Sequence, residues 1–329
     1  MQHLVRGRAL AVLALLGTIG LVGLGPSAAG ADDPPPIDAG FPTAATTGYP
    51  HGLPGDTRTP VTLTPYTGPF TITVPGTVIE NKHITDRLNI RAANVTIRNS
   101  LIQVTNAQAI NITNNPAYWG LKVIDTEIDG TRTDNSTGGI SLIGDGGYRL
   151  IRVDAHSSGD IARANWGGVA IVDSWLHDPY CIQESCHNDV IQTTEANCVL
   201  GASSIDGLVA GTTDKVEGSF CIKILGNRLE NPFTQTSLML FKADQGDIHD
   251  VLVAGNLLNG GGYGLYWYDH NVGTYHSTHG TVLDNTWLRA PNGGFHVKGG
   301  YNNTHAFRAA LLPTWSGNRW ADTLARIPR

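Results

Sequence analysis

Residues 184–198, ESCHNDVIQTTEANC, bring together side chains that could move a proton. His187 and Asp189 stand two positions apart at the start of an expected strand, and Cys186 comes directly before them. Imidazole and carboxylate groups are common general acids and bases in enzymes. A short loop closed at Cys186 would hold such a pair in place, but it could equally serve only to staple a corner of the fold. Which interpretation holds, catalytic or structural, depends on the strands that surround this segment.

Six short runs alternate apolar and polar residues, which predicts strands whose polar side chains face outward. These runs are 139–144, 160–165, 188–193, 237–242, 264–269 and 294–299. If consecutive runs lie side by side, Asp160 or Arg163 neighbours Asp189 and Gln192. Lys242 and Asp244 come next, then Tyr266 and Tyr268, then His296 and Lys298. A slip of one residue would exchange inward and outward side chains.

This arrangement defines the candidate site. The candidates for catalysis are His187, Asp189, Lys242 and Arg163, and those for substrate binding are Gln192, Tyr266, Tyr268, His296 and Lys298. Asp160 and Asp189 are candidate calcium ligands. Tyr263 adds a third aromatic ring, whereas we expect Trp267 to face inward as part of the core. We also expect His177 and Asp178, on the preceding turn, to lie near the site.

A recurring pattern predicts how the runs stack: apolar, any residue, Asn/Asp/Gly, small, any residue, apolar. Its third positions, the anchors, are Asn99, Asp125, Asp154, Asp173, Gly226, Gly255, Asp284 and Gly317. Two neighbours of Asp154 break the pattern, Arg152 before it and Ser157 after it. Leucine-rich and helical repeats would show other spacings. The pattern therefore predicts an all-β solenoid, a right-handed parallel β-helix, whose coils stack at the strand spacing and share one continuous core.

One interval between anchors is unusually long. Asp173 and Gly226 are 53 residues apart, against 19 to 33 for the other intervals. An insertion at 199–220 explains the difference, and Cys198 and Cys221 flank it. In an exported chain an even number of cysteines indicates disulfides. We therefore predict one bridge at the base of the insertion and a second between Cys181 and Cys186.

The first residues indicate export. Arg6 and Arg8 precede the apolar run 9–24, and small residues surround Ala31, which is typical of a secretory signal peptide cleaved after that residue. We expect a signal peptide at 1–31, a Pro-, Gly- and Thr-rich, loosely attached lead-in at 32–60, and the β-helix at 61–329. The net charge of −6 is the opposite of the usual balance in nucleic-acid-binding proteins. We expect a secreted monomer with no membrane span and no nucleic-acid partner.

Four segments carry a resemblance to a known group of proteins: VTIRNSLI (95–102), VAIVDSWLHD (169–178), CIKILGNRLEN (221–231) and VLVAGNLLNGGGYGLYWY (251–268). With them, residues 61–320 resemble the right-handed parallel β-helix, or pectin-lyase-like, superfamily of secreted bacterial proteins. The resemblance concerns architecture. It implies a carbohydrate-active protein and, as substrate class, an acidic polysaccharide.

Cleavage of a uronan by β-elimination would have three requirements. Arg163, Lys242 or a calcium ion would neutralise the carboxylate, His187 or Lys242 would take the C5 proton, and Tyr266 or Tyr268 would protonate the leaving oxygen. A lyase is therefore the first expectation for function, with no certain cofactor beyond the candidate calcium.

Two alternatives stay open. A glycoside hydrolase would use Asp160 and Asp189 as paired carboxylates, and a non-catalytic glycan-binding or cell-surface protein would need neither. The Trp-Ile-Asp-His motif of pectate lyases is absent, and HDPY (177–180) differs from the Asp-Pro-His of mannuronan epimerases. The Asn-Thr-Asp, paired-Asp and Gly-His-Gly motifs of β-helix glycosidases are also absent. No catalytic set of a known family can therefore be transferred.

Peptide mapping of the unreduced protein tests the insertion. We predict linked peptides for Cys198–Cys221 and Cys181–Cys186. A peptide in which Cys186 is bonded to Cys198 would contradict a bridge at the base of the insertion.

Overall fold

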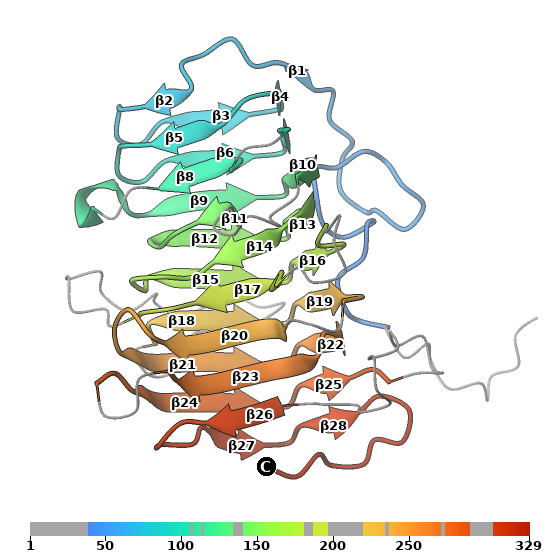
Figure 1. Ribbon diagram of the computed structural model, residues 1–329. Coiled ribbons are helices and arrows are strands. Elements are labelled where there is room, and N and C mark those ends of the chain that lie inside the picture. Colours follow the sequence, from blue (N-terminus) through green and yellow to red (C-terminus); the bar gives the residue numbers. More distant parts are fainter. Residues whose placement is uncertain are drawn as a thin grey trace, which may run out of the picture. The chain divides into compact units, whose positions relative to one another are not determined.

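The computed structural model describes residues 39–105, 108–112, 115–133, 141–180, 187–196, 220–233, 237–270, 274–289 and 305–329. These residues form a right-handed parallel β-helix, in which each coil contributes one strand to each of three parallel sheets (Figure 1). The helical structure within the described ranges is a single 3-10 turn, η1 (Pro116–Tyr118). The fold class predicted from the repeat is confirmed.

Every sheet pairs strands from successive coils, and its strands are therefore not consecutive in sequence. Sheet A contains β1 (Thr64–Pro65), β4 (Lys82–Ile84), β7 (Leu101–Gln103), β10 (Glu127–Thr133), β13 (Asp154–Ser158), β16 (Trp175–His177), β19 (Arg228–Asn231), β22 (Leu257–Gly260), β25 (Thr286–Trp287) and β28 (Arg319–Trp320). Sheet B contains β2 (Thr71–Ile72), β5 (Leu88–Ile90), β8 (Ile110–Ile112), β11 (Ser141–Gly144), β14 (Asp160–Arg163), β17 (Ile191–Thr193), β20 (Ser237–Ala243), β23 (Tyr263–Asp269) and β26 (His305–Arg308). Sheet C contains β3 (Val78–Glu80), β6 (Thr96–Arg98), β9 (Leu121–Ile124), β12 (Tyr148–Ile151), β15 (Val169–Val172), β18 (Ile222–Leu225), β21 (Ile248–Ala254), β24 (Ser277–Leu283) and β27 (Thr314–Ser316).

The core is a set of aliphatic columns that run through the coils. In sheet A, one inward position from β4 to β22 is occupied by Ile84, Ile102, Ile128, Ala155, Leu176, Leu229 and Leu258, all fully buried. Burying a Leu or Ile side chain contributes about 1.5–3 kcal/mol, which is enough to fix the register coil by coil. Aromatic residues pack at the two ends of the core, Tyr66 and Phe70 at the first coil and Trp315 and Trp320 at the last.

The chain turns from sheet C to sheet A through residues in the left-handed conformation. The turns lie at Asn99, Asp125, Arg152, Asp173, Gly226, Gly255, Asp284 and Gly317, with φ between 44° and 67°. The predicted anchor Asp154 is therefore wrong by two residues, since the turn falls at Arg152 and Asp154 begins β13. Asn, Asp and Gly tolerate this conformation best.

Arg152 departs from that preference, and an ion pair accompanies the departure. Its Nε and Nη2 each donate to one oxygen of Asp125, both at 2.7 Å, in a bidentate pair between neighbouring coils. Arg58 donates to the same Asp125 carboxylate at 2.9 Å and also to the backbone oxygens of Thr47 and Gly48. The described part of the lead-in is thus hydrogen-bonded to the solenoid, and the expected loose attachment is wrong for it.

Directly after each turn in the C-terminal half stands a buried asparagine. Asn227, Asn256, Asn285 and Asn318 form a ladder through four coils. Within it, Asn256 Nδ2 donates to the backbone oxygen of Ile224 at 2.9 Å and to Asn285 Oδ1 at 2.8 Å, while its Oδ1 accepts the backbone N–H of Asn227 at 2.8 Å. Each amide satisfies backbone groups that the turn leaves without strand partners.

Five of the six expected outward strands are present, as β11, β14, β17, β20 and β23. The stretch 294–299 lies outside the described residues, and the strand that pairs with β23 on its far side is β26. The sixth expected strand therefore stays a prediction.

The long interval does not interrupt the stack, because β15 pairs with β18 from Val169↔Ile222 to Val172↔Leu225. β15 and β18 are therefore neighbouring strands of sheet C, and the insertion at 199–220 stays a prediction. Cys221 is buried at its end, while Cys181, Cys186 and Cys198 lie outside the described residues. The two pairings stay predictions.

No helix in the described ranges is long and apolar enough to cross a membrane.

Replacing Asn256 with alanine tests the ladder. We expect a loss of about 2–3 kcal/mol in the free energy of unfolding, because buried backbone groups of two coils lose their partners. Urea unfolding measures this. The matched control is Asn89→Ala, since the half-buried Asn89 side chain accepts one hydrogen bond from Asn111 on the outside of sheet B. Equal losses in the two variants would contradict a special role for the ladder.

Candidate functional site

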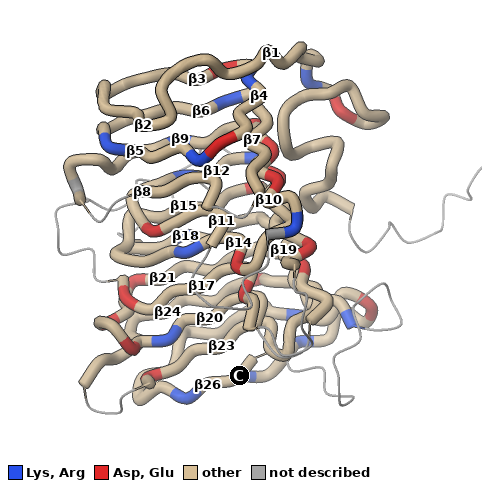
Figure 2. Tube along the Cα trace, turned by 45° about the horizontal axis from the view of Figure 1, so that its top comes forward, with Lys and Arg blue, Asp and Glu red and all other residues tan. Residues whose placement is uncertain are grey.

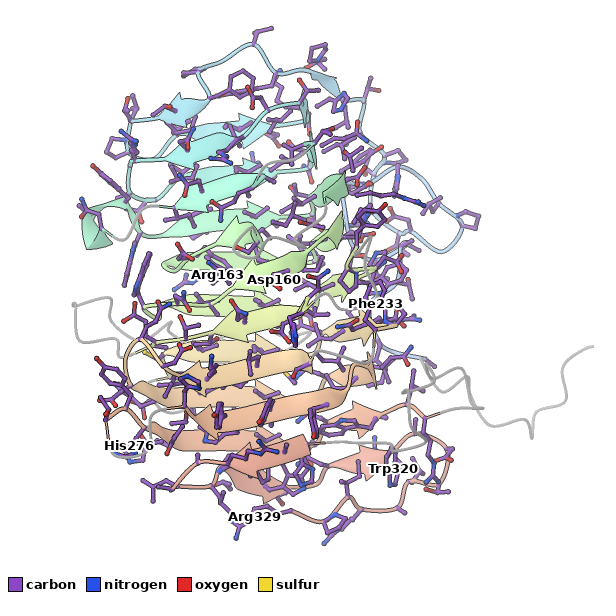
Figure 3. All side chains as sticks on the ribbon, viewed as in Figure 1. Asp160, Arg163, Phe233, His276, Trp320 and Arg329 are labelled. Carbon is purple, nitrogen blue, oxygen red and sulfur yellow. The ribbon has the colours of Figure 1, made fainter. Side chains whose placement is uncertain are left out.

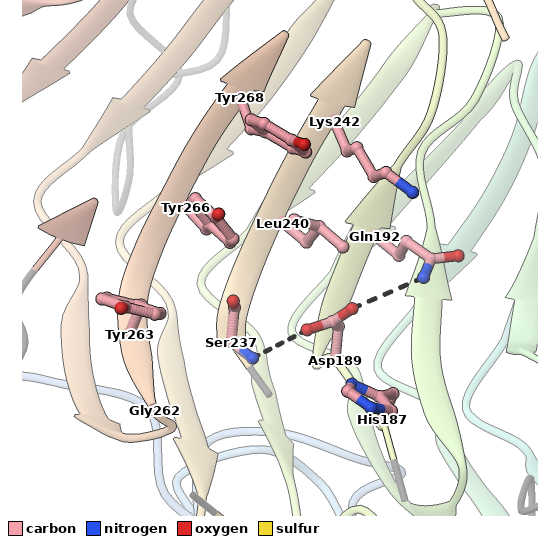
Figure 4. A pocket seen from close by; sticks show the side chains of 10 residues that line it. All are labelled: His187, Asp189, Gln192, Ser237, Leu240, Lys242, Gly262, Tyr263, Tyr266 and Tyr268. Carbon is pink, nitrogen blue, oxygen red and sulfur yellow. Dashed lines mark hydrogen bonds between the residues drawn. The ribbon is translucent and has the colours of Figure 1, made fainter. Parts of the chain in front are cut away.

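A pocket of about 400 Å³ lies on the outer face of sheet B (Figure 4). It is formed by β17, β20, β23 and the segment before β17, and its lining residues are His187, Asp189, Gln192, Ser237, Leu240, Lys242, Gly262, Tyr263, Tyr266 and Tyr268. Seven of the residues named for the site are among them: His187, Asp189, Gln192, Lys242, Tyr263, Tyr266 and Tyr268. They come from three coils, and only the stacking of those coils brings them together.

Strand register explains their position. Arg163 pairs with Gln192, Gln192 with Leu240, and Leu240 with Tyr266, so these outward side chains form one column across β14, β17, β20 and β23. A second column contains Lys242 and Tyr268. The neighbours predicted for Arg163 are confirmed, whereas the residue beside Tyr266 is Leu240 and not a charged group.

Asp189 lies at the floor of the pocket, just before β17, and is 4% exposed. Its Oδ1 accepts the backbone N–H of Ser237 at 2.8 Å, and Gln192 Nε2 donates to its Oδ2 at 3.4 Å. Burial, and then the nearby Asp160 carboxylate, raise the pKa of Asp189, although both hydrogen bonds and the Lys242 ammonium oppose the shift. Asp189 therefore retains a proton at a pH where an exposed aspartate has lost it.

Asp160 and Arg163 lie together on β14, one coil away (Figure 3). Asp160 Oδ1 accepts the backbone N–H of Asp189 at 2.9 Å, and its Oδ2 lies 3.7 Å from Arg163 Nη2. Arg163 Nε also lies 4.0 Å from Asp145 Oδ1. Neither Asp160 nor Arg163 lines the pocket. Arg163 acts as a counter-ion for the buried carboxylates behind it.

The residues at this position do not fit a calcium ion. Calcium needs six to eight oxygen ligands, but the Asp160 oxygens face a backbone N–H and a guanidinium, and one Asp189 oxygen accepts the backbone N–H of Ser237. Within the described ranges, no group of three or more His, Cys, Asp or Glu residues could hold a metal ion. The candidate calcium site at Asp160 and Asp189 is therefore not supported.

Lys242 and His187 differ in their surroundings at the pocket. Lys242 Nζ lies 2.7 Å from Asp244 Oδ2 in an ion pair. His187 is exposed, and its imidazole lies next to Asp189 at the edge of the pocket (Figure 4). The geometry thus suits Lys242 for charge neutralisation and leaves His187 as the imidazole available to accept a proton.

Three tyrosine rings follow one another along β23 (Figure 4). The ring centres of Tyr263 and Tyr266 are 5.2 Å apart, and those of Tyr266 and Tyr268 are 5.4 Å apart with an angle of 16° between the rings. Trp267 points inward and is fully buried, as predicted. Aromatic faces aligned in this way offer apolar surface for the C–H faces of sugar rings.

His177 and Asp178, which we expected near the site, are not among the residues that line the pocket, and His177 belongs to sheet A. His177 Nε2 is 2.8 Å from Asp154 Oδ1, and its Nδ1 is 2.9 Å from Asp178 Oδ2. Burial lowers the pKa of His177, but its hydrogen bonds to Asp154 and Asp178 outweigh that effect and raise the pKa to about 9. His177 is thus a charged structural group in a cluster of its own.

Sequence analysis missed Ser237, Leu240 and Gly262 among the lining residues. Ser237 and Leu240 belong to the predicted run 237–242, and alternation with the buried Met239 and Phe241 could have identified Leu240 as outward. His296 and Lys298 lie outside the described residues.

Comparison with protein-family models, curated proteins and solved structures finds no match for this chain. The case for a function therefore depends on the pocket.

The buried proton gives a testable dependence of stability on pH. The folded state keeps a proton on the Asp160–Asp189 pair that the unfolded chain loses near pH 4, so the wild type should lose stability as the pH rises from about 4 towards the raised folded value. Asp189→Asn cannot ionise and its oxygen can still accept the Ser237 N–H. Its loss of stability from about pH 4 to about pH 8 should be smaller by at least about 1.4 kcal/mol.

Urea unfolding across that range measures the effect. The exposed Asp86 provides the control variant Asp86→Asn, which should follow the wild type. A pH profile for Asp189→Asn parallel to that of the wild type would show that Asp189 is ionised in the folded protein.

Proposed function

We propose that this protein is a secreted polysaccharide lyase of the pectin-lyase-like type that cleaves an acidic, uronate-containing polysaccharide by β-elimination. One observation carries the proposal: a single pocket combines a row of tyrosine rings, a lysine and a buried carboxyl group, Asp189, whose pKa is raised by burial. A carboxyl group without charge does not repel an anionic sugar, and it can donate a hydrogen bond to it. Export rests on the sequence of residues 1–31.

The pocket residues can be assigned to the three requirements of the reaction. Lys242 and the protonated Asp189 would neutralise the uronate carboxylate, which acidifies the neighbouring C5–H. His187 would accept the C5 proton, and the electron pair of that bond would form the C4–C5 double bond while the C4–O bond breaks. Tyr266, whose pKa is raised by burial, would donate its proton to the leaving oxygen.

The arrangement of carboxylates favours this reaction over hydrolysis. A glycosidase needs two carboxyl groups that face the scissile bond. Asp189 is the one acidic residue among the lining residues that the structure describes, and Asp160 directs one oxygen to the Asp189 backbone instead of into the pocket. Asp160 is thus poorly placed to act as the second carboxyl group.

The non-catalytic alternative is distinguished by His187, which takes part in chemistry but contributes little contact area. A glycan-binding protein would keep its affinity and have no reaction to lose when His187 is removed. The test below therefore measures both product formation and binding.

Incubation with a panel of uronans tests the function. We expect ultraviolet absorbance from unsaturated products with the wild type, and a rate roughly 10²–10⁴-fold lower for His187→Ala, as is typical for loss of a general base. Lys242→Ala should also reduce the rate. His51→Ala serves as control, because His51 is exposed in the segment before β1 and lies outside the pocket.

Three outcomes separate the alternatives. Release of reducing sugar without ultraviolet absorbance would indicate a hydrolase. Binding of a uronan without either product, unchanged in His187→Ala, would indicate a binding protein. Unsaturated products formed equally fast by wild type and His187→Ala would contradict the role given to His187.

A further inference from the structure

One basic residue beside the pocket has no counter-ion among the residues that the structure describes. Arg308, in β26, is exposed, and its guanidinium lies over the ring of Tyr266 at 5.7 Å from the ring centre. Register places it directly next to Tyr268, which in turn pairs with Lys242. One column therefore reads Lys242, Tyr268, Arg308 across β20, β23 and β26.

The charges of the other two cations near the site are already compensated. Lys242 is paired with Asp244 at 2.7 Å, and Arg163 lies 3.7 Å from Asp160. Throughout the part of the chain that the structure describes, Arg308 makes no ion pair with Asp or Glu within 4.0 Å. Figure 2 shows acidic and basic residues interspersed over the strands in that view, so local pairing, and not a broad field of one sign, sets the charge available to a ligand.

Contact with Tyr266 leaves the guanidinium suited to recognition. When a guanidinium lies over an aromatic ring, its face is occupied and its N–H groups still point outward at its edge. That edge matches the two oxygens of a carboxylate, which it can bind with two parallel hydrogen bonds. The Tyr266 ring would hold this edge beside the pocket.

We propose that Arg308 is a binding residue for the carboxylate of a second acidic sugar, next to the one held in the pocket. The inference rests on the proposed function and adds the direction in which the polysaccharide would lie on sheet B. The backbones at Lys242 and Arg308 are separated by two strand spacings, about 10 Å, and Tyr268 lies between them. The ligand would thus cross β20, β23 and β26 along the solenoid axis, with one carboxylate at each end and a sugar ring on Tyr268.

Isothermal titration calorimetry with defined oligosaccharides tests this. The probes are a galacturonic acid hexamer, a mannuronic acid hexamer and the fully methyl-esterified galacturonic acid hexamer. So that the hexamer is not cleaved during the titration, the Arg308 and Arg91 variants and the protein they are compared with all carry His187→Ala. We expect Arg308→Gln to bind an acidic hexamer roughly tenfold more weakly than this parent protein, as for loss of a charge-assisted hydrogen bond. Binding of the neutral ester should change less than twofold. Arg308→Lys should recover only part of the affinity, because an ammonium cannot form the bidentate contact.

The matched control is Arg91→Gln. Arg91 is exposed directly after β5 of the same sheet, far along the stack from β23, so the change in net charge is identical. It should bind the acidic hexamers like the parent protein. If Arg91→Gln weakens binding as much as Arg308→Gln, the effect is one of total charge and the assignment of Arg308 is wrong.

The remaining outcomes separate this inference from the function on which it rests. An acidic hexamer that binds without being cleaved by the wild type, and binds more weakly to Arg308→Gln, would overturn the lyase and support the Arg308 site. Equal losses for the acidic and the esterified hexamers would show that Arg308 only supports the Tyr266 ring, which overturns the site. A parent protein that binds no acidic hexamer would overturn both.

Discussion

Register between coils is the constraint on which the rest of the structure depends. It is set at the turn from sheet C to sheet A, where one residue per coil adopts a left-handed conformation and the next residue points inward. In the C-terminal half the inward residue is an asparagine whose amide bonds to the coils on both sides. Because these amides are buried, a coil shifted by one residue would leave their hydrogen bonds unmade. The register of the coils is therefore set by inward residues, independently of the outward side chains.

Because the coils stack in a fixed register, residues that are far apart in the sequence become neighbours in space. Gln192, Leu240 and Tyr266 are separated by dozens of residues, yet they are direct neighbours in one outward column. The pocket exists because three such coils place a carboxyl group, an ammonium and aromatic rings side by side. Since sheet B carries these columns on a regular spacing, it is well suited to a ligand that itself repeats, and a polysaccharide has that property.

The fold could be predicted because its determinants are local. Asn, Asp and Gly at the turns, with apolar residues at fixed distances, specify a coil without reference to the rest of the chain. The misplaced anchor at Asp154 shows the limit of this reasoning. Arg152 takes the left-handed position while pairing with Asp125 of the preceding coil, and such a contact between coils is invisible to a pattern of residue types.

The sequence was sufficient to predict most of the residues at the site, but not the role of each. Alternation identified Lys242, Tyr266 and Tyr268 as outward, which the structure agrees with. The inaccessible place of Asp160, behind the Asp189 backbone, depends on the path of the chain before β17. Arg308 was missed for a related reason: the chain between β23 and β26 is longer than one regular coil, so counting residues could not place it beside Tyr268.

The central claim is that sheet B binds an acidic polysaccharide across its strands at this pocket. A crystal structure of the His187→Ala variant with a bound uronic acid hexamer tests it most directly. The account predicts sugar rings over Tyr266 and Tyr268 with one carboxylate within hydrogen-bond distance of Lys242 and Asp189. A hexamer bound on sheet A or sheet C, or lying along β23 with no carboxylate at Lys242, would contradict it.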